Sequence, residues 1–147
     1  MRAVVQRVER AGVSVDEREV ARIGRGFLVL VGFRKGEAET ALEWMARKIA
    51  SLRVFQDGEG RMTAALDAVG GEMLVVSQFT LYADVNKGAR PSFDQSAPAE
   101  EARRLYDRFV GLLRAQTRGR VATGEFQASM KVDLVNDGPV TIVIDRE

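Results

Sequence analysis

The spacing of hydrophobic residues predicts short strands near the N-terminus and one strand that is buried on both faces. Within the first 15 residues, apolar positions alternate with polar ones, and turn signals stand at residues 11–12 and 16–17. Residues 26–32 are apolar without alternation. A short apolar run of this kind is typical of a strand that is covered on both sides.

Apolar residues at helical spacing predict a first helix over residues 37–52. The apolar positions are Leu42, Met45, Ile49 and Leu52. Glu39 lies near the start and Lys48 near the end, an order of charges that suits the helix dipole.

A second helix is predicted after residue 96. Ser96 can cap it, and Pro98 and Glu100 are favourable in a first turn. Its predicted buried face consists of Ala102, Leu105, Phe109, Leu112 and Leu113.

Further strands are predicted between and after the helices. They span residues 53–55, 72–82, 129–136 and 139–145, and the last two are joined by a turn around residues 137–138. Strands and helices do not alternate regularly. We therefore predict an α+β fold with an antiparallel or mixed sheet, in a single domain over residues 1–147.

Composition excludes several kinds of chemistry. The 147 residues carry a net charge of +1 and contain neither cysteine nor histidine. Disulfides, thiol catalysis, histidine-based triads and most zinc sites are therefore excluded. No metal motif or cofactor motif is present, so we expect no cofactor. The longest apolar run is too short to span a bilayer, and no signal-peptide pattern occurs, so we expect a cytoplasmic protein without membrane contact.

The segment Ser77, Gln78, Phe79 and Thr80 is a candidate catalytic site at the polar end of an apolar strand. It can equally be a strand with hydroxyls on one face. In the functional interpretation, backbone N–H groups and the Thr80 hydroxyl polarise a ligand carbonyl without any titrating group. Thr80 as a nucleophile would need a base, and no spacing identifies one.

The Gly138-Pro139 pair is a second candidate, although a simple hairpin turn is the favoured interpretation. If the bond were cis, two carbonyl oxygens would face the same side and could capture an ammonium group.

The loop over residues 86–93 mixes cations with Phe93 and can bind phosphate and stack a base, or it can be a solvated surface loop. Downstream arginines include Arg118 and Arg120, which are candidate phosphate contacts. Trp44 and Tyr106 lie within helical patterns and are expected to be packing residues.

Several motifs together resemble the D-aminoacyl-tRNA deacylases, also called D-tyrosyl-tRNA deacylases. They are residues 5–8 (Val-Gln-Arg-Val), 77–81 (Ser-Gln-Phe-Thr-Leu), 87–93 (Lys-Gly-Ala-Arg-Pro-Ser-Phe), 130–132 (Met-Lys-Val) and 136–141 (Asn-Asp-Gly-Pro-Val-Thr). The resemblance runs from end to end. One departure is the presence of Gln127 and Ser129 where glycine and aspartate are expected.

The resemblance implies a homodimer with a barrel-like sheet, outer helices and active sites at the dimer interface. Gly138 and Pro139 would form a cis pair that reaches into the partner's pocket, and Arg7 would hold that segment in place. Phe93 and Met130 would lie near the terminal adenosine of the tRNA.

The implied reaction is hydrolysis of the ester between a D-amino acid and the tRNA 3′ end, with glycyl-tRNA as a further substrate. A rigid backbone wall would reject L-aminoacyl groups by collision, and the ribose 2′-hydroxyl would help to activate water. Two alternatives remain open. One is an RNA-binding dimer without catalysis, and the other is an editing domain that acts on L-amino acids.

Overall fold

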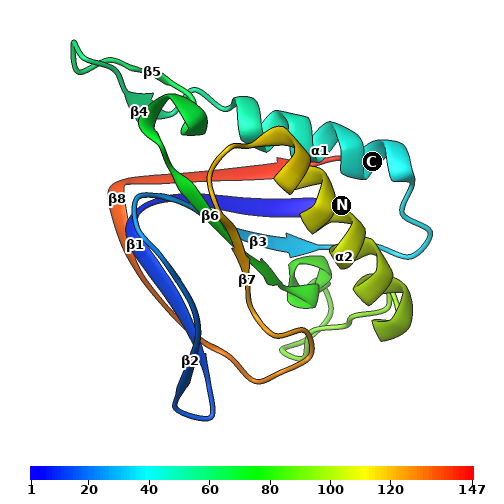
Figure 1. Cartoon of the computed structure of the whole chain (residues 1–147). Coiled ribbons are helices and arrows are strands. Elements are labelled where there is room, and N and C mark those ends of the chain that lie inside the picture. Colours follow the sequence, from blue (N-terminus) through cyan, green and yellow to red (C-terminus); the bar gives the residue numbers. More distant parts are fainter.

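A computed structural model of the chain describes residues 1–147 as one mixed sheet with two helices packed on it (Figure 1). The sheet strands are β1 (Arg2–Val15), β2 (Arg18–Ile23), β3 (Gly26–Gly32), β6 (Glu72–Ser77), β7 (Val121–Thr123) and β8 (Lys131–Asp145). Their order is β2-β1-β3-β6-β7, and β8 pairs with β1. Pairing is antiparallel around β1 and parallel from β3 to β6 and from β6 to β7.

Alternate residues of the central strands enter two separate hydrophobic cores. Phe27, Val29 and Val31 of β3 belong to a core of 25 buried residues beneath the helices. Leu28, on the opposite face of β3, belongs to a second core of 8 buried residues inside the curved sheet. β3 is thus buried on both faces, as its unbroken apolar sequence predicts.

Two helices cover the larger core and contact each other. They are α1 (Glu39–Ser51) and α2 (Ala99–Gln116). Tyr106 is buried in α2, and its hydroxyl donates a hydrogen bond of 2.7 Å to the Val75 carbonyl of β6. Trp44 is half-buried on α1 and packs against the larger core. Both residues are therefore packing residues, as predicted, although Leu112 of α2 is only half-buried.

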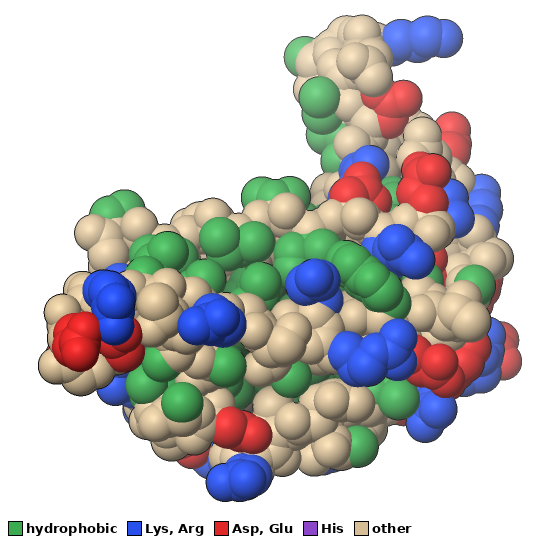
Figure 2. All heavy atoms as spheres, turned by 90° about the horizontal axis from the view of Figure 1, so that it is seen from above, with side chains coloured by type: hydrophobic (Ala, Val, Ile, Leu, Met, Phe, Trp, Pro, Cys, Tyr) green, Lys and Arg blue, Asp and Glu red, His purple; other side chains and the backbone are tan.

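Short elements complete the fold. A hairpin of β4 (Phe55–Gln56) and β5 (Met62–Ala64) extends from the body at the upper left of Figure 1. Two 3-10 turns, η1 (Leu66–Val69) and η2 (Phe79–Tyr82), flank β6. Neither long helix is apolar enough to cross a membrane. One face of the molecule exposes hydrophobic side chains with lysine and arginine side chains among them (Figure 2).

Two predicted turns are wrong because both lie inside long strands. Residues 11–12 continue β1, where Ala11 pairs with both Ile23 and Leu134. Residues 137–138 do not form a hairpin, because the segments on either side of them both pair with β1. The register shifts there, so the pair forms an irregularity within β8. Pairing with distant strands overrides the local turn preference of glycine at both places.

Two further expectations about the middle of the chain are also wrong. The strand that begins at Glu72 ends at Ser77 rather than near residue 82, because Phe79–Tyr82 folds into η2. Ser96 does not cap α2, which begins after Pro98. Its hydroxyl instead donates a hydrogen bond of 3.1 Å to the Phe79 carbonyl.

Candidate functional site

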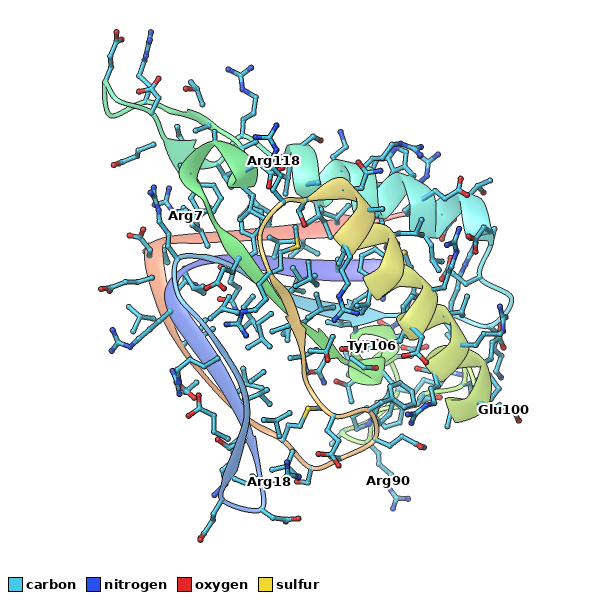
Figure 3. All side chains as sticks on the ribbon, in the orientation of Figure 1. Arg7, Arg18, Arg90, Glu100, Tyr106 and Arg118 are labelled. Carbon is cyan, nitrogen blue, oxygen red and sulfur yellow. The ribbon has the colours of Figure 1, made fainter.

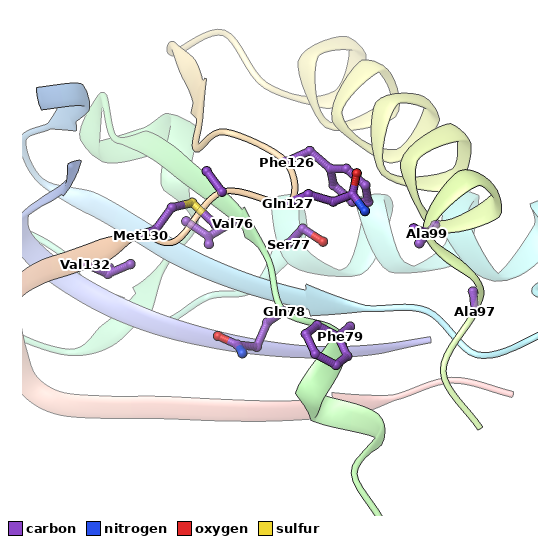
Figure 4. Close-up of a pocket in the computed structure, with 12 residues that line it drawn as sticks. Val76, Ser77, Gln78, Phe79, Ala97, Ala99, Phe126, Gln127, Met130 and Val132 are labelled. Carbon is purple, nitrogen blue, oxygen red and sulfur yellow. The ribbon is translucent and has the colours of Figure 1, made fainter. Parts of the chain in front are cut away.

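A cavity of about 530 Å³ lies where β6 ends, between the start of α2 and the segment that follows β7 (Figure 4). Twelve residues line it: Val76, Ser77, Gln78, Phe79, Ala97, Ala99, Ala102, Phe126, Gln127, Ala128, Met130 and Val132. None of these side chains titrates. The cavity is therefore suited to hold an apolar or aromatic group and to position it with backbone and amide groups.

The structure brings most of the predicted site residues together at this cavity. Ser77, Gln78, Phe79 and Met130 line it directly. Phe93 packs against Phe79 with ring centroids 5.1 Å apart in an edge-to-face arrangement. Both rings are substantially exposed. They form an aromatic surface at the rim on which a planar ligand can stack.

Thr80 has no base beside it. The Gln78 side-chain amide donates a hydrogen bond of 2.5 Å to the Thr80 hydroxyl oxygen. An amide cannot accept a proton at neutral pH, and no lysine or carboxylate is hydrogen-bonded to Thr80. This arrangement argues against an activated threonine nucleophile.

The backbone of the Gln78–Thr80 segment is held firmly in place. The Gln78 N–H donates to the Val31 carbonyl at 2.8 Å, and Ser96 fixes the carbonyl of Phe79. The first bond within η2 runs from Leu81 N–H to the Gln78 carbonyl. The N–H groups of Phe79 and Thr80 precede it and have no acceptor within the turn. They form a pair of backbone donors close to the cavity.

Gly32 allows this turn to lie close to β3. A Cβ atom at Gly32 would lie 2.8 Å from the Gln78 carbonyl oxygen and 3.1 Å from Cβ of Leu81. Only glycine permits that approach without displacement of the turn. Sequence reasoning missed Gly32 and assigned Ser96 to a helix cap, because the role of both residues depends on contacts between distant segments.

Three predicted site residues do not line this cavity: Arg7, Gly138 and Pro139. The buried Arg7 side chain donates to the Asp137 carbonyl at 2.9 Å and to the Val54 carbonyl at 2.7 Å. The Gly138-Pro139 bond is cis, and both residues are exposed. Arg7 thus ties the 138–139 segment to the body of the protein.

The 138–139 segment is distant from the cavity of its own chain. Ser77 pairs with Val31, which pairs with Ala3, whereas Arg7 lies four residues further along β1. Strand geometry then separates the segment from Ser77 by roughly 15–20 Å. Figure 3 shows Arg7 beside the bend of β8, at the end of the sheet away from η2.

Gln127 has a left-handed backbone, with φ of 66°. Glycine adopts this conformation readily and other residues uncommonly. The backbone therefore explains why glycine is expected here from the family resemblance. In this chain the Gln127 side chain lines the cavity instead (Figure 4).

No group of three or more acidic side chains gathers in the structure to hold a metal ion. Burial raises the pKa of the Tyr106 hydroxyl, which remains a hydrogen-bond donor to Val75 and does not act as an acid at neutral pH.

Comparison with known proteins identifies the family. A family model described as D-Tyr-tRNA(Tyr) deacylase matches residues 4–145. The chain belongs to this family. A D-aminoacyl-tRNA deacylase of Chlorobaculum parvum is 52% identical over 145 residues, covering 99% of this chain and 97% of the relative. One of Geobacter sulfurreducens is 54% identical over 147 residues, covering 100% and 96%. The family indicated by the sequence motifs is thereby confirmed.

Two solved structures are similar to this chain over almost its whole length. The c-Myc DNA Unwinding Element Binding Protein has a TM-score of 0.95 at 42% identity, covering 100% of this chain and 99% of the other. A probable eukaryotic D-amino acid tRNA deacylase has a TM-score of 0.84 at 20% identity, covering 99% and 98%. The likeness confirms the predicted α+β fold with a barrel-like mixed sheet and helices outside it.

Proposed function

We propose that this chain hydrolyses the ester bond of D-aminoacyl-tRNA. Family membership carries the proposal, and the cavity at the end of β6 is the site that we assign to the reaction. Water attacks the ester carbonyl carbon, and the bond from that carbon to the ribose oxygen breaks. The products are a D-amino acid and a tRNA with a free 3′ end, the ribose oxygen having taken up a proton.

Backbone groups rather than titrating side chains stabilise the transition state in this proposal. The N–H groups of Phe79 and Thr80 donate to the carbonyl oxygen as negative charge develops on it. Preorganised donors of this kind commonly contribute a few kcal/mol. The cavity lining offers no base, so the ribose 2′-hydroxyl of the substrate helps to activate the water. The protein's main contribution is then to hold the ester in position.

We assign the terminal adenosine of the tRNA to the aromatic part of the site. Phe79 and Phe93 form an exposed edge-to-face pair at its rim, and Met130 lines its interior. Base stacking on aromatic side chains contributes about 1–3 kcal/mol per base and tolerates any base. The ester would then lie near Ser77, Gln78 and Thr80.

We further propose that a second copy of the chain completes the site. The 138–139 segment is exposed and too far from the cavity of its own chain to act there, whereas Arg7 holds its shape. In a homodimer this segment would reach the partner's cavity. Its backbone would bind the substrate ammonium group and collide with an L side chain, while D-aminoacyl groups and glycine would fit.

A comparison of matched D- and L-tyrosyl-tRNA tests the function. We expect rapid loss of the D ester and little loss of the L ester beyond a control without enzyme. Binding of tRNA without loss of either ester would indicate a non-catalytic RNA-binding protein. Equal loss of both would indicate an editing domain or an esterase without chiral selection.

A mixing experiment tests the shared site. Ala99→Trp fills the cavity, and Arg7→Met releases the 138–139 segment, so we expect each variant to be inactive alone. If the sites are shared, half of the dimers in an equilibrated mixture are hybrids with one intact site, and activity recovers to about a quarter of wild type. No recovery from folded, mixed dimers would show that each cavity works with its own chain.

A further inference from the structure

A second cavity, of about 460 Å³, adjoins the first along α2. Phe126 lines both cavities, and Ala102 of the first directly precedes Arg103 of the second. The two cavities therefore lie next to each other between α2 and the segment after β7, with Phe126 as a shared wall. A ligand that occupies the first cavity and passes Phe126 can contact the second.

The second cavity differs from the first in carrying charge. Arg103 and Arg114 line it from α2, together with Asp107, and Glu125 lines it from the segment after β7. Glu125 is paired with Arg18 at 3.2 Å. Two arginines thus face one unpaired carboxylate, which gives the cavity a local positive charge.

Arg103 is oriented toward the boundary between the cavities. Its guanidinium carbon lies 5.5 Å from the centre of the Phe126 ring, in a cation–π contact. Arg103 forms no ion pair, in contrast to Arg108 further along α2, which pairs with Glu39. Its guanidinium is therefore available to an anionic ligand. Arg114 is less available to an anionic ligand, because its guanidinium donates a hydrogen bond of 3.0 Å to the Val121 carbonyl.

We propose that the second cavity binds the phosphate that joins the terminal adenosine of the tRNA to the preceding nucleotide, with Arg103 as the main contact. The inference rests on the proposed function, since it takes the adenosine to occupy the first cavity. Guanidinium groups bind phosphate through paired hydrogen bonds, and stacking on Phe126 orders the arginine in advance. Asp107, one helical turn along α2 and exposed like Arg103, would repel the phosphate and favour a position beside Arg103 and Phe126.

The test compares Arg103→Gln with Arg104→Gln. Arg104 is the next residue on the same helix, is exposed, forms no ion pair and does not line either cavity. Each variant is assayed on D-tyrosyl-tRNA and on D-tyrosyl-adenosine, which lacks the preceding phosphate. Thermal unfolding of both variants provides the control for folding.

We expect Arg103→Gln to raise KM for D-tyrosyl-tRNA roughly tenfold, the usual size of a lost charge-assisted contact, with little change in kcat. Its kinetics on D-tyrosyl-adenosine should match wild type. The slope of log(kcat/KM) for the tRNA against log salt should fall by about 0.7, as for one contact to a single strand. Arg104→Gln should match wild type on both substrates.

Three results would overturn the proposal. An equal loss on both substrates would mean that Arg103 acts by packing on Phe126. An equal loss in both variants on the tRNA would mean that the charge of α2 attracts tRNA without a defined phosphate site. The third result is that Arg103→Gln has no effect on hydrolysis of D-tyrosyl-tRNA, while the wild-type protein hydrolyses D-tyrosyl-adenosine. This result would refute the phosphate site and leave the proposed function standing.

Discussion

A single methyl group at Gly32 should reduce catalysis although Gly32 carries no reactive group. In Gly32→Ala the new Cβ atom lies 2.8 Å from the Gln78 carbonyl oxygen, against 3.4 Å or more in an ordinary contact. The turn must therefore move by about 0.6 Å, since β3 is fixed between two cores. Errors of about 1 Å in the position of reacting groups can cost roughly 100-fold in rate.

We expect kcat for D-tyrosyl-tRNA to fall roughly 10- to 100-fold in this variant, with a smaller change in KM. Overpacking should also lower the free energy of unfolding by about 1–3 kcal/mol. Single-turnover kinetics measure the first effect, and urea unfolding measures the second at a temperature where the variant remains folded. A kcat within twofold of wild type would refute the idea that the backbone position of residues 78–80 controls the reaction.

Four further predictions follow from the same site and fold. Thr80→Ala should retain most activity, because the backbone N–H remains; complete loss in a folded protein that binds tRNA would instead support a threonine nucleophile. The ratio of enzymatic to spontaneous ester hydrolysis should stay flat between about pH 5 and 6.5, where the substrate amino group remains an ammonium, because no side chain lining the cavity titrates; a ratio that changes with pH in this range would contradict this. Tyr106→Phe should lower the free energy of unfolding by only about 0.5–1.5 kcal/mol in a denaturant titration, because Gly124 N–H still bonds to the Val75 carbonyl; a larger loss would mean that the hydroxyl does more than satisfy this carbonyl. Gly111→Ala, in open space on α2, should raise the free energy of unfolding by about 0.5–1 kcal/mol, and a decrease in this free energy would contradict the open surroundings.

The elements that the sequence predicted well are those governed by burial over many residues. β3 was identifiable because both of its faces enter a core, and both helices were identifiable from their apolar spacing. Ser96 was misassigned because its local context suits a helix cap, whereas its hydroxyl contacts Phe79 from the neighbouring loop. Local preferences could not anticipate a contact that depends on how two loops meet.

The candidate site could be predicted in part for a similar reason. The 77–80 motif marks the end of β6, and family resemblance supplied Phe93 and Met130. The small residues Ala99 and Ala102, which make room for the cavity, carry no chemical signal and were missed as lining residues. The position of residues 138–139 also escaped prediction, because a glycine–proline pair usually indicates a turn and here lies within a long strand.

The pairing of β1 with β8 has a consequence for how the chain acquires its structure. These two strands form the most extensive pairing in the sheet, yet partners such as Arg2 and Asp145 are separated by almost the whole sequence. Contacts between such distant segments slow folding, because a long loop must close before they form. On the ribosome, one edge of β1 stays unpaired until β8 has left the exit tunnel. Synthesis of β8, rather than formation of the helices, is then the step that completes the sheet.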